Sequence, residues 1–516
     1  MAFCTVLSAS VQGLGVEMIR VEADVSNGLP MFHMVGYLSS EVKEASERVR
    51  TAIRNSGMKL PAKKIIVNLA PATVRKKGAS FDLPIALAVL AAMGYIPEEA
   101  MERVIVTGEL SLEGKIRGVP GVLPMVIEAK EQGCKSFILP GENEPEGRLV
   151  KGIEILPADN LEELCAYLNG AARSEKSKRE KKENEKNRQH RAREDFADIC
   201  GQKAVKRAAE IAVAGGHNLL MAGSPGSGKT MIAKRIATIL PELSWEESLE
   251  ITKIYSVLGL VDQEYPLITQ RPFRNVHHTI TRTALTGGGR IPMPGEISMA
   301  HGGVLFLDEL AEFPRNVLEV LRQPLEEHQI HIARNYGNFT FPAEFMLVAA
   351  MNPCPCGNYP DVQKCSCTPG QIQKYLGKIS QPFLDRMDIC IETPKVVYRD
   401  LDGERKDLEG EETSETIRRR VTDARNIQRE RYKGTDIRTN AVLGPQEIGH
   451  YVELGECERK MMELAFERIG LTARTYHKIL RVARTIADLD YSEKVKEKHL
   501  KEAIAYRSLD KKYWGR

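Results

Sequence analysis

The sequence predicts an α/β protein in three parts, with mixed strand-and-helix domains over residues 1–170 and 195–395 and a helical domain over 396–516. Three observations support this. A short apolar run enters the glycine-rich loop G-S-P-G-S-G-K-T, and apolar residues at helical spacing follow it. A later apolar run ends in two acids, as a buried parallel strand does at a binding edge. The last part of the chain shows helical periodicity.

Within the first 170 residues, strand-like runs alternate with helical ones. Residues 65–69, 104–106 and 137–139 are short and apolar, which is typical of buried strands. Helices are expected over 41–56 and 83–93, and a short amphipathic helix over 161–168 closes the domain. Composition assigns this domain no chemistry.

The glycine-rich loop has the residue types that bind phosphate. Gly226 and Gly228 let the backbone turn its N–H groups toward an anion, and the following helix adds the positive end of its dipole. Lys229 supplies a positive charge for the outer phosphates, and the Thr230 hydroxyl suits Mg²⁺. We expect ATP and Mg²⁺ at Gly223, Ser224, Pro225, Gly226, Ser227, Gly228, Lys229 and Thr230. A tight turn beside a core strand is the alternative.

Two later strands are expected to end at the same sheet edge, where open α/β sheets bind ligands. The first precedes Asp308, which would hold magnesium through water, and Glu309, which would orient or activate the attacking water. The second, residues 345–350, precedes Asn352, whose amide can position that water. A capping role for Asn352 before Pro353 is the alternative.

Two arginines are candidates for stabilising charge on the phosphates. Arg386 lies between Asp385 and Asp388 at a predicted helix-to-strand junction. Within one chain it could pair with either acid, whereas in a ring it could reach a neighbour's γ-phosphate. Arg474 lies in the first turn of a helix capped by Thr472, where the helix dipole disfavours a cation. Its partner is expected to be the γ-phosphate of its own subunit's ATP or a nearby acid.

The helical part of the chain ends with two amphipathic helices. The first covers 458–469 and stops at Gly470. The second follows Thr472 and is expected to bury Tyr476, Ile479, Leu480, Ala483, Ile486 and Ala487. Lys478 and Arg481 continue the face of Arg474 on this helix, and solvated side chains are the alternative.

Four of the ten cysteines lie in one short insert after Asn352. Cys354, Cys356, Cys365 and Cys367 have the spacing C-x-C-x8-C-x-C. Four thiolates can surround one tetrahedral zinc ion in a structural site, although the more usual spacing is C-x2-C. A structural Zn²⁺ over residues 354–367 is therefore expected, with unligated or redox-active thiols as the alternative.

Charge and hydropathy restrict where partners can bind. The formal net charge is only +3, so a nucleic-acid surface would have to be local. No run is long and apolar enough to cross a membrane, and the first residues lack a leader pattern, so we expect a cytoplasmic protein without membrane contact. Residues 171–194 are highly charged and aperiodic, which indicates a solvated linker; attraction to a phosphate backbone is the alternative.

The N-terminal domain resembles the C-terminal domain of the Lon protease family, over motifs that begin at residues 76–80 and end at 134–140. Ser80 falls where that family has its nucleophile. The general-base lysine would fall near Met125, and a thioether cannot take a proton from serine. The resemblance therefore implies a Lon-like (ribosomal S5 domain 2-like) fold without the Ser–Lys dyad.

The order of phosphate loop, acid pair, asparagine and arginine is that of AAA+ ATPases. Residues 294–310 and 348–357 resemble the magnesium-chelatase-like AAA+ branch, and the whole chain except the linker resembles the YifB/ComM family. This implies an AAA+ P-loop NTPase module with a C-terminal helical lid, in a homo-oligomeric ring, expected to be a hexamer, that moves on DNA. ComM members of the family are branch-migration helicases that integrate transforming DNA.

Two segments are candidates for DNA contact in the pore of such a ring. Residues 274–290 contain three consecutive glycines and are expected to form a mobile loop, whose Arg282 and Arg290 would grip phosphates. Residues 330–341 are expected to form a hairpin, where Arg334 and Tyr336 would offer a charge and a stacking face. Solvated arginines and a core tyrosine are the alternatives.

Two other functions remain open at this point. One is a motor subunit that inserts magnesium into a porphyrin, and the other is a protein-remodelling or protease-associated ATPase. The catalytic set expected for hydrolysis is Lys229, Glu309, Asn352, Arg386 and Arg474.

Overall fold

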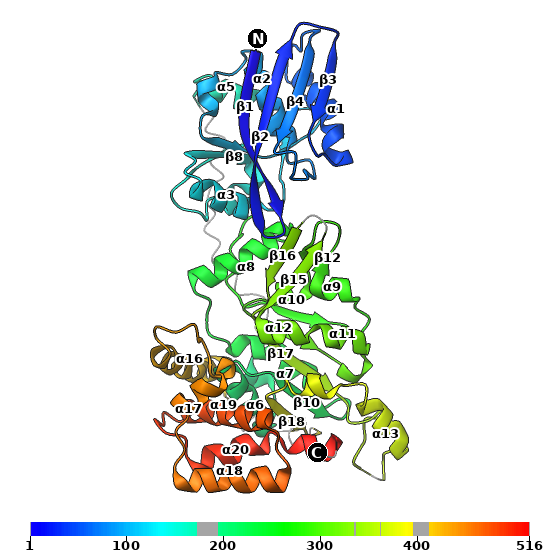
Figure 1. Ribbon diagram of the computed structural model, residues 1–516, viewed down its shortest axis with the longest axis vertical. Helices are drawn as coiled ribbons and strands as arrows, with labels where there is room; N and C mark the ends of the chain where they lie inside the picture. The colour runs from blue at the N-terminus through cyan, green and yellow to red at the C-terminus, as the bar shows by residue number, and fades with distance from the viewer. Residues whose placement is uncertain (1, 173–193, 335–336, 362, 396–411, 515–516) are drawn as a thin grey trace.

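The computed structural model describes residues 2–172, 194–334, 337–361, 363–395 and 412–514. The molecule is elongated, with the N-terminal domain at one end, the phosphate-loop module in the middle and the helical lid at the other end (Figure 1). Most of the predicted linker 171–194 and the candidate Tyr336 lie outside the described residues.

The N-terminal domain is built on a seven-stranded sheet of order β3-β4-β2-β1-β5-β8-β9. Its strands are β1 (Ala2–Gln12), β2 (Gly15–Ser26), β3 (Met31–Val35), β4 (Lys64–Ala70), β5 (Val104–Val106), β8 (Ser136–Pro140) and β9 (Glu154–Ala158), and β6 (Glu109–Leu110) pairs with β7 (Ile116–Arg117) beside them. The helices are α1 (Ser40–Asn55), α2 (Asp82–Ala92), α3 (Val122–Glu131), α4 (Glu144–Gly147) and α5 (Leu161–Leu168). The apolar residues of α1, α2 and α5 share one core with the sheet, and those of α3 belong to a second. The domain is thus the mixed α/β fold that the sequence predicts.

The N-terminal domain contacts the middle module, and two of the contacts among the described residues are close. The tip of the long β1–β2 hairpin reaches the module (Figure 1), and an added Cβ at Gly13 would lie 2.9 Å from the ring of Phe339. Beside it, the Gly121 amide donates to the Ser256 carbonyl over 2.9 Å, and the Ser256 hydroxyl donates to the buried carboxylate of Glu146. Burial raises the pKa of Glu146, and the bond from Ser256 opposes that rise.

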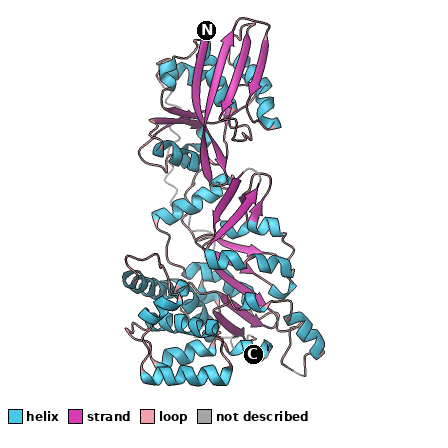
Figure 2. Cartoon of the chain, in the orientation of Figure 1, coloured by secondary structure: helices cyan, strands magenta, loops and turns pink. Residues whose placement is uncertain are grey.

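The middle module contains a five-stranded sheet of order β11-β14-β17-β10-β18, in which every neighbouring pair is parallel. The strands are β10 (Leu219–Gly223), β11 (Phe273–Val276), β14 (Val304–Leu307), β17 (Met346–Met351) and β18 (Ile389–Thr393). Its helices include α6 (Lys203–Gly215), α7 (Lys229–Ile236), α8 (Trp245–Val257), α10 (Glu296–Met299), α11 (Arg315–Val320), α12 (Arg322–Glu327), α13 (Pro369–Leu376) and α14 (Gln381–Leu384). Figure 2 shows helices beside this sheet, and alternate residues of its strands belong to two different apolar clusters, so both faces are covered, as an all-parallel sheet requires.

The prediction of an irregular loop over 274–290 was wrong in part. Residues 273–276 are the edge strand β11, and α9 (Arg282–Thr286) leads into β12 (Gly287–Gly288), which pairs with β13 (Met293–Pro294). An added Cβ at Gly287 would lie 2.2 Å from the Met293 carbonyl oxygen. The glycines therefore permit close approach of two backbones, which a run of glycines alone does not distinguish from a loop.

The predicted hairpin is confirmed. β15 (Gln329–Arg334) pairs antiparallel with β16 (Gly337–Pro342), from Gln329 opposite Pro342 to Arg334 opposite Gly337. Ile330, Ile332 and Phe341 face the module's core, as the alternation of the sequence predicts.

The C-terminal part is helical and shares a core with the sheet. It comprises α16 (Ser414–Arg431), α17 (Pro445–Tyr451), α18 (Glu456–Ile469), α19 (Ala473–Leu489), α20 (Glu497–Ala505) and α21 (Ser508–Trp514). One apolar cluster joins the sheet face formed by Leu219 and Val348 to α6 and to Ile479 and Leu480 of α19. The lid is therefore packed on the module rather than tethered to it.

Two side chains of α19 exclude the solvated alternative. Lys478 is buried; its ammonium donates 2.9 Å to the Met387 carbonyl and lies 3.4 Å from an Asp388 carboxylate oxygen. Arg481 is half-buried, and its Nε has no hydrogen-bond partner among the described residues. Helical periodicity identifies a face of α19, but it does not reveal that α19 packs on the 386–388 junction.

The buried His217 makes stability depend on pH. Its Nε2 lies 2.8 Å from the Thr485 hydroxyl, and burial lowers the pKa of His217 from 6.5 to about 4, against the attraction of Asp388 and with the repulsion of Arg481, Arg425 and Lys478. Below pH 6.5 the unfolded chain binds a proton that the folded chain does not. We expect the free energy of unfolding to fall between pH 6.5 and 4, with a limiting slope of about 1.4 kcal/mol per pH unit from this group.

The measurement is the melting temperature at pH 7.5 and pH 5.0 for the wild type and for His217→Gln. The wild type should lose more stability on acidification than the variant. Equal losses in both proteins would contradict the assignment. Asp388, whose pKa is lowered by Lys478 and His217 against burial, titrates below this interval.

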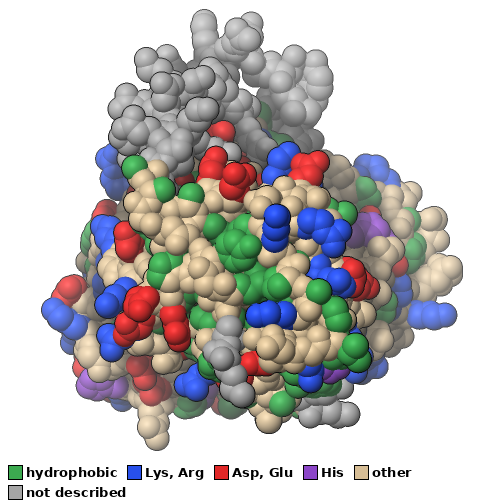
Figure 3. Space-filling view, turned by 90° about the horizontal axis from the view of Figure 1, so that it is seen from above, with side chains coloured by type: hydrophobic (Ala, Val, Ile, Leu, Met, Phe, Trp, Pro, Cys, Tyr) green, Lys and Arg blue, Asp and Glu red, His purple; other side chains and the backbone are tan. Residues whose placement is uncertain are grey.

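Among the described residues, none of the helices combines the length and the apolar character needed to cross a lipid bilayer. On the face seen down the long axis from the N-terminal end, basic and acidic side chains are interspersed (Figure 3). This mixture agrees with the nearly balanced net charge.

Candidate nucleotide site and cysteine cluster

The glycine-rich loop joins the end of the central strand β10 to the start of α7. Gly228 has φ +82° and precedes the first helical residue, and Gly226 has φ +77° with no atom within 4 Å of an added Cβ. The loop thus turns at two glycines and has open space at Gly226. This is the geometry in which backbone N–H groups surround a phosphate.

Lys229 lies inside the loop. Its ammonium donates to the Gly223 carbonyl over 2.8 Å, to the Ser224 carbonyl over 3.0 Å and to the Asn352 amide oxygen over 3.2 Å. Burial lowers the pKa of Lys229, although Asp308 attracts the charge. The structure therefore brings together the lysine and the asparagine that the sequence proposed as one site.

The two predicted magnesium residues are in direct contact. The Thr230 hydroxyl donates 2.7 Å to an Asp308 carboxylate oxygen. Thr230 lies in the first turn of α7 and Asp308 follows β14, so both oxygens lie at the carboxyl edge of the sheet. Hydroxyl and carboxylate oxygens are ligands that Mg²⁺ prefers.

Glu309 follows Asp308 in a constrained conformation. Its φ is +53°, in the left-handed region, and one carboxylate oxygen lies 3.3 Å from Nδ1 of His278. His278 stacks against His277 and contacts the edge of Phe313. A non-glycine residue held at positive φ is strained, and such strain clusters at functional sites. His278 was not predicted to have a role, and only its place in the segment before the acid pair could have indicated one.

Arg386 lies at the end of α14 and is largely buried, with 9% of its side chain exposed. Its guanidinium donates to the Pro382 carbonyl over 2.6 Å and to the exposed carboxylate of Glu326. The pairing of Arg386 with Asp385 or Asp388, considered for a single chain, was wrong, because its acidic partner is Glu326. The reason is that α12 places Glu326 against the junction, a contact between segments sixty residues apart.

The backbone at this junction is held from two sides. The Asn218 side chain donates 3.0 Å to the Arg386 carbonyl, and the Asn218 amide N–H donates 3.0 Å to the Asp388 carboxylate. Lys478 holds the other side, through Met387 and Asp388. Arg386 is thus positioned by β10 and by the lid together.

Arg474 is exposed, with 69% of its side chain accessible, and its nearest acid is Asp385 at 3.9 Å. This is the nearby acid pair that the sequence left as one of two possibilities. Thr472 caps α19 by accepting from the Thr475 amide, as predicted. At this distance and exposure the pair is weak, which leaves Arg474 able to pair with another anion.

One further residue supports the loop. The Gln202 side chain donates 2.8 Å to the Ser227 carbonyl, and Gln202 itself has φ +52° at the start of α6. The sequence before α6 gave no signal for this role.

The residues present fit ATP and Mg²⁺. Lys229 is a buried cation whose ammonium contacts carbonyl and amide oxygens, Gly226 leaves space for a phosphate, and Thr230 with Asp308 supplies hard oxygen ligands. When bound, magnesium would neutralise charge on the β- and γ-phosphate oxygens.

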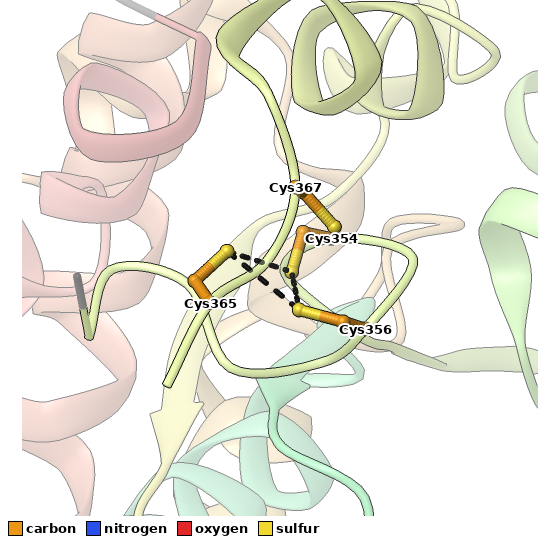
Figure 4. Close-up of side chains that lie close together, drawn as sticks. All are labelled: Cys354, Cys356, Cys365 and Cys367. Carbon is orange, nitrogen blue, oxygen red and sulfur yellow. Dashed lines mark hydrogen bonds between the residues drawn. The ribbon is translucent and has the colours of Figure 1, made fainter. Parts of the chain in front are cut away.

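Figure 4 shows the four sulfur atoms of Cys354, Cys356, Cys365 and Cys367 directed toward one another. All four lie within 4.8 Å of one another, and the Cys354–Cys356, Cys356–Cys365 and Cys354–Cys365 pairs are 3.4, 3.6 and 3.8 Å apart. A hydrogen bond with the backbone of Asn358 is the largest cause that lowers the pKa of Cys356, to about 6, whereas, against a backbone hydrogen bond, the neighbouring cysteines raise the pKa of Cys365 and of Cys367. The cluster is compatible with one zinc ion.

The cluster gives a direct prediction. Purified chain should contain about one zinc per protomer by elemental analysis, because four thiolates complete a structural site. Cys365→Ser should lower that content, whereas the matched change Cys457→Ser, at an exposed cysteine outside the insert, should not. Wild-type zinc content in Cys365→Ser would contradict the site.

The candidate DNA residues lie on adjacent elements. Arg282 begins α9 and is exposed, as is Arg290. The Arg334 guanidinium donates 3.3 Å to the Gly289 carbonyl, so the hairpin and the glycine segment are in contact. The structure therefore brings together the two segments that the sequence treated separately.

Comparison with known proteins adds the family. Residues 195–401 match the family model described as magnesium chelatase, subunit ChlI, residues 411–507 match its C-terminal model, and residues 21–143 match a model described as subunit ChlI of Mg-chelatase. Over 126 residues, 24% of this chain and 22% of the other, the chain is 32% identical to Lon protease 2 of Bacillus subtilis.

Several relatives match almost the whole chain. YifB of Escherichia coli is 43% identical over 513 residues, and competence protein ComM of Haemophilus influenzae is 42% identical over 513 residues. Each alignment covers 99% of this chain and 98% of the relative. The chain therefore belongs to the YifB/ComM family of magnesium-chelatase-like AAA+ proteins.

Proposed function

We propose that this protein is a ring-forming ATPase that couples ATP hydrolysis to movement along DNA, with a helicase or branch-migration activity in recombination or natural transformation. The observation that carries the ATPase is the contact of Thr230 with Asp308 beside the bond from Lys229 to Asn352. Four polar side chains from three separate segments of the chain, Lys229 with Thr230, Asp308 and Asn352, lie there at the carboxyl edge of a parallel sheet.

In the proposed reaction, the loop amides and Lys229 hold the phosphates, and Thr230 and Asp308 would hold magnesium. Glu309 orients or deprotonates the attacking water, and Asn352 fixes its position. Arg386 of one subunit stabilises charge on the neighbour's γ-phosphate, and Arg474 contacts the γ-phosphate of its own subunit.

Two observations support DNA as the partner. The hairpin residue Arg334 contacts the glycine segment that follows Arg282, which gathers exposed arginines on neighbouring elements. In addition, a full-length relative is named competence protein ComM, which supports a role in competence.

The decisive experiment measures the ATPase rate with no DNA and with single-stranded, duplex and branched DNA, together with the size of the ATP-bound particle. The proposal expects a ring whose ATPase is stimulated by DNA, most by the structure it acts on. Arg334→Ala should lose stimulation while keeping the basal rate, because Arg334 lies outside the phosphate loop and, among the described residues, its guanidinium hydrogen bonds go to the Gly289 and Ala333 carbonyls.

A monomeric ATPase that is indifferent to every DNA would refute the proposal. Stimulation by partner chelatase subunits instead of DNA would favour a motor subunit that inserts magnesium into a porphyrin. The supporting observation is that the matching family model is described as magnesium chelatase, subunit ChlI. Casein turnover abolished by Ser80→Ala would favour a protease-associated ATPase, for which the local similarity to a Lon protease is the supporting observation.

A further inference from the structure

The cysteine insert touches the phosphate loop. The backbone of Gly357, in the turn that follows Cys354 and Cys356, lies against the ring of Pro225. An added Cβ at Gly357 would be 2.2 Å from Pro225 Cδ and 2.7 Å from its Cγ. No side chain fits between these two segments, so the turn and the loop are in direct van der Waals contact.

The same turn is tied to the cysteines at both ends. The Gly357 amide donates 3.0 Å to the Cys354 carbonyl, and the Tyr359 amide lies 3.4 Å from the Cys354 sulfur. The Asn358 side chain is 3.4 Å from the carbonyls of both Cys356 and Lys364, which links the two halves of the insert. A change at the sulfurs would therefore move the turn as a unit.

The insert reaches the catalytic residues by a second route. Asn352, which accepts from Lys229, lies two residues before Cys354 on the same chain segment. The four-cysteine cluster is thus connected to the phosphate loop through the contact of Gly357 with Pro225. It is also connected, through the backbone, to Asn352, the residue proposed to position the attacking water.

We propose that a zinc ion held by Cys354, Cys356, Cys365 and Cys367 clamps the phosphate loop through the contact of Gly357 with Pro225, so that metal occupancy sets ATP affinity. Four metal–sulfur bonds fix the turn, and the fixed turn holds Pro225 and the loop amides in the orientation that binds phosphate. Loss of the metal releases the turn, and the entropy lost in ordering the loop then reduces the free energy of ATP binding. The inference rests on the proposed ATP site and adds its regulation by a thiophilic metal.

The test measures the Kd of a fluorescent ATP analogue, at fixed Mg²⁺ and with reductant, for full-length protein before and after zinc removal by a chelator. We expect zinc-free protein to bind the analogue at least about tenfold more weakly, which corresponds to a modest change in loop preorganisation. Added Zn²⁺ should restore the Kd, and added Mg²⁺ should not. An unchanged Kd after zinc removal would overturn the clamp.

Glycine variants separate the contact from the metal. Gly357→Ala should keep its zinc yet weaken analogue binding, because the new methyl group displaces Pro225. Gly370→Ala is the matched control in the same region, since its added Cβ meets no atom within 4 Å, and Gly434→Ala controls for strain at φ +84° in open space. Pro225→Ala in the Gly357→Ala background should recover part of the affinity.

The outcomes keep the two proposals apart. If zinc-loaded wild type binds no analogue, the nucleotide site itself is wrong. If it binds and Gly357→Ala binds equally well with full zinc, the nucleotide site stands and the clamp is wrong. Should Gly357→Ala fail to fold, the chelation experiment on wild type decides alone.

Discussion

Glu309→Gln is expected to lower kcat for ATP hydrolysis by about 10²- to 10⁴-fold while leaving ATP binding intact. The amide keeps the size of the side chain but cannot take a proton from water. Because the ATP-bound form then persists, the ring should also be stabilised. The measurements are steady-state phosphate release, the Kd of an ATP analogue and particle size with ATP.

Glu312→Gln is the matched control. Glu312 ends the short helical turn Leu310–Glu312 that directly follows Glu309. Its carboxylate pairs with Lys378 at 3.0 Å rather than with His278. Wild-type turnover in Glu309→Gln, or an equal loss in both variants, would refute Glu309 as the general base.

Arg386→Ala should lower the ATPase rate of a pure ring by about 10³-fold or more, the effect typical of an arginine that stabilises transferring phosphate. Mixing tests whether the arginine acts between subunits. Subunits that lack Lys229 but keep Arg386 should restore hydrolysis at the intact sites of Arg386→Ala subunits. If mixing restores nothing, Arg386 does not act in trans.

Glu326→Gln distinguishes this role from a structural one, because Glu326 is the observed partner of the Arg386 guanidinium. To reach a neighbour's phosphate, Arg386 would exchange this carboxylate for another anion. Loss of Glu326 should therefore leave the rate unchanged or raise it. If Arg386 merely held α12 in place, Glu326→Gln would impair the ring as Arg386→Ala does.

Sequence reasoning located the parts of the site that are contiguous. The phosphate loop and the Asp308–Glu309 pair carry their chemistry within a few residues of a strand, so local pattern suffices. The hairpin was predicted from its alternation and its tip for the same reason.

What the sequence missed are contacts between distant segments. Glu326 for Arg386, His278 for Glu309 and Pro225 for Gly357 have no local signal, because each depends on how helices and inserts pack around the sheet. The misreading of Gly287 has a related cause. A glycine needed for close backbone approach looks, in a sequence, the same as a glycine in a loop.

The junction at Gly13 bears on what the Lon-like domain contributes. The bare backbone of that turn rests on the aromatic ring of Phe339, in the hairpin that also carries Arg334, while Glu146 and Ser256 secure the same junction nearby. Any movement of this hairpin would therefore also move the seven-stranded sheet of the N-terminal domain, so the two domains are mechanically coupled. In the DNA motor proposed above, this coupling would give the N-terminal domain a mechanical role.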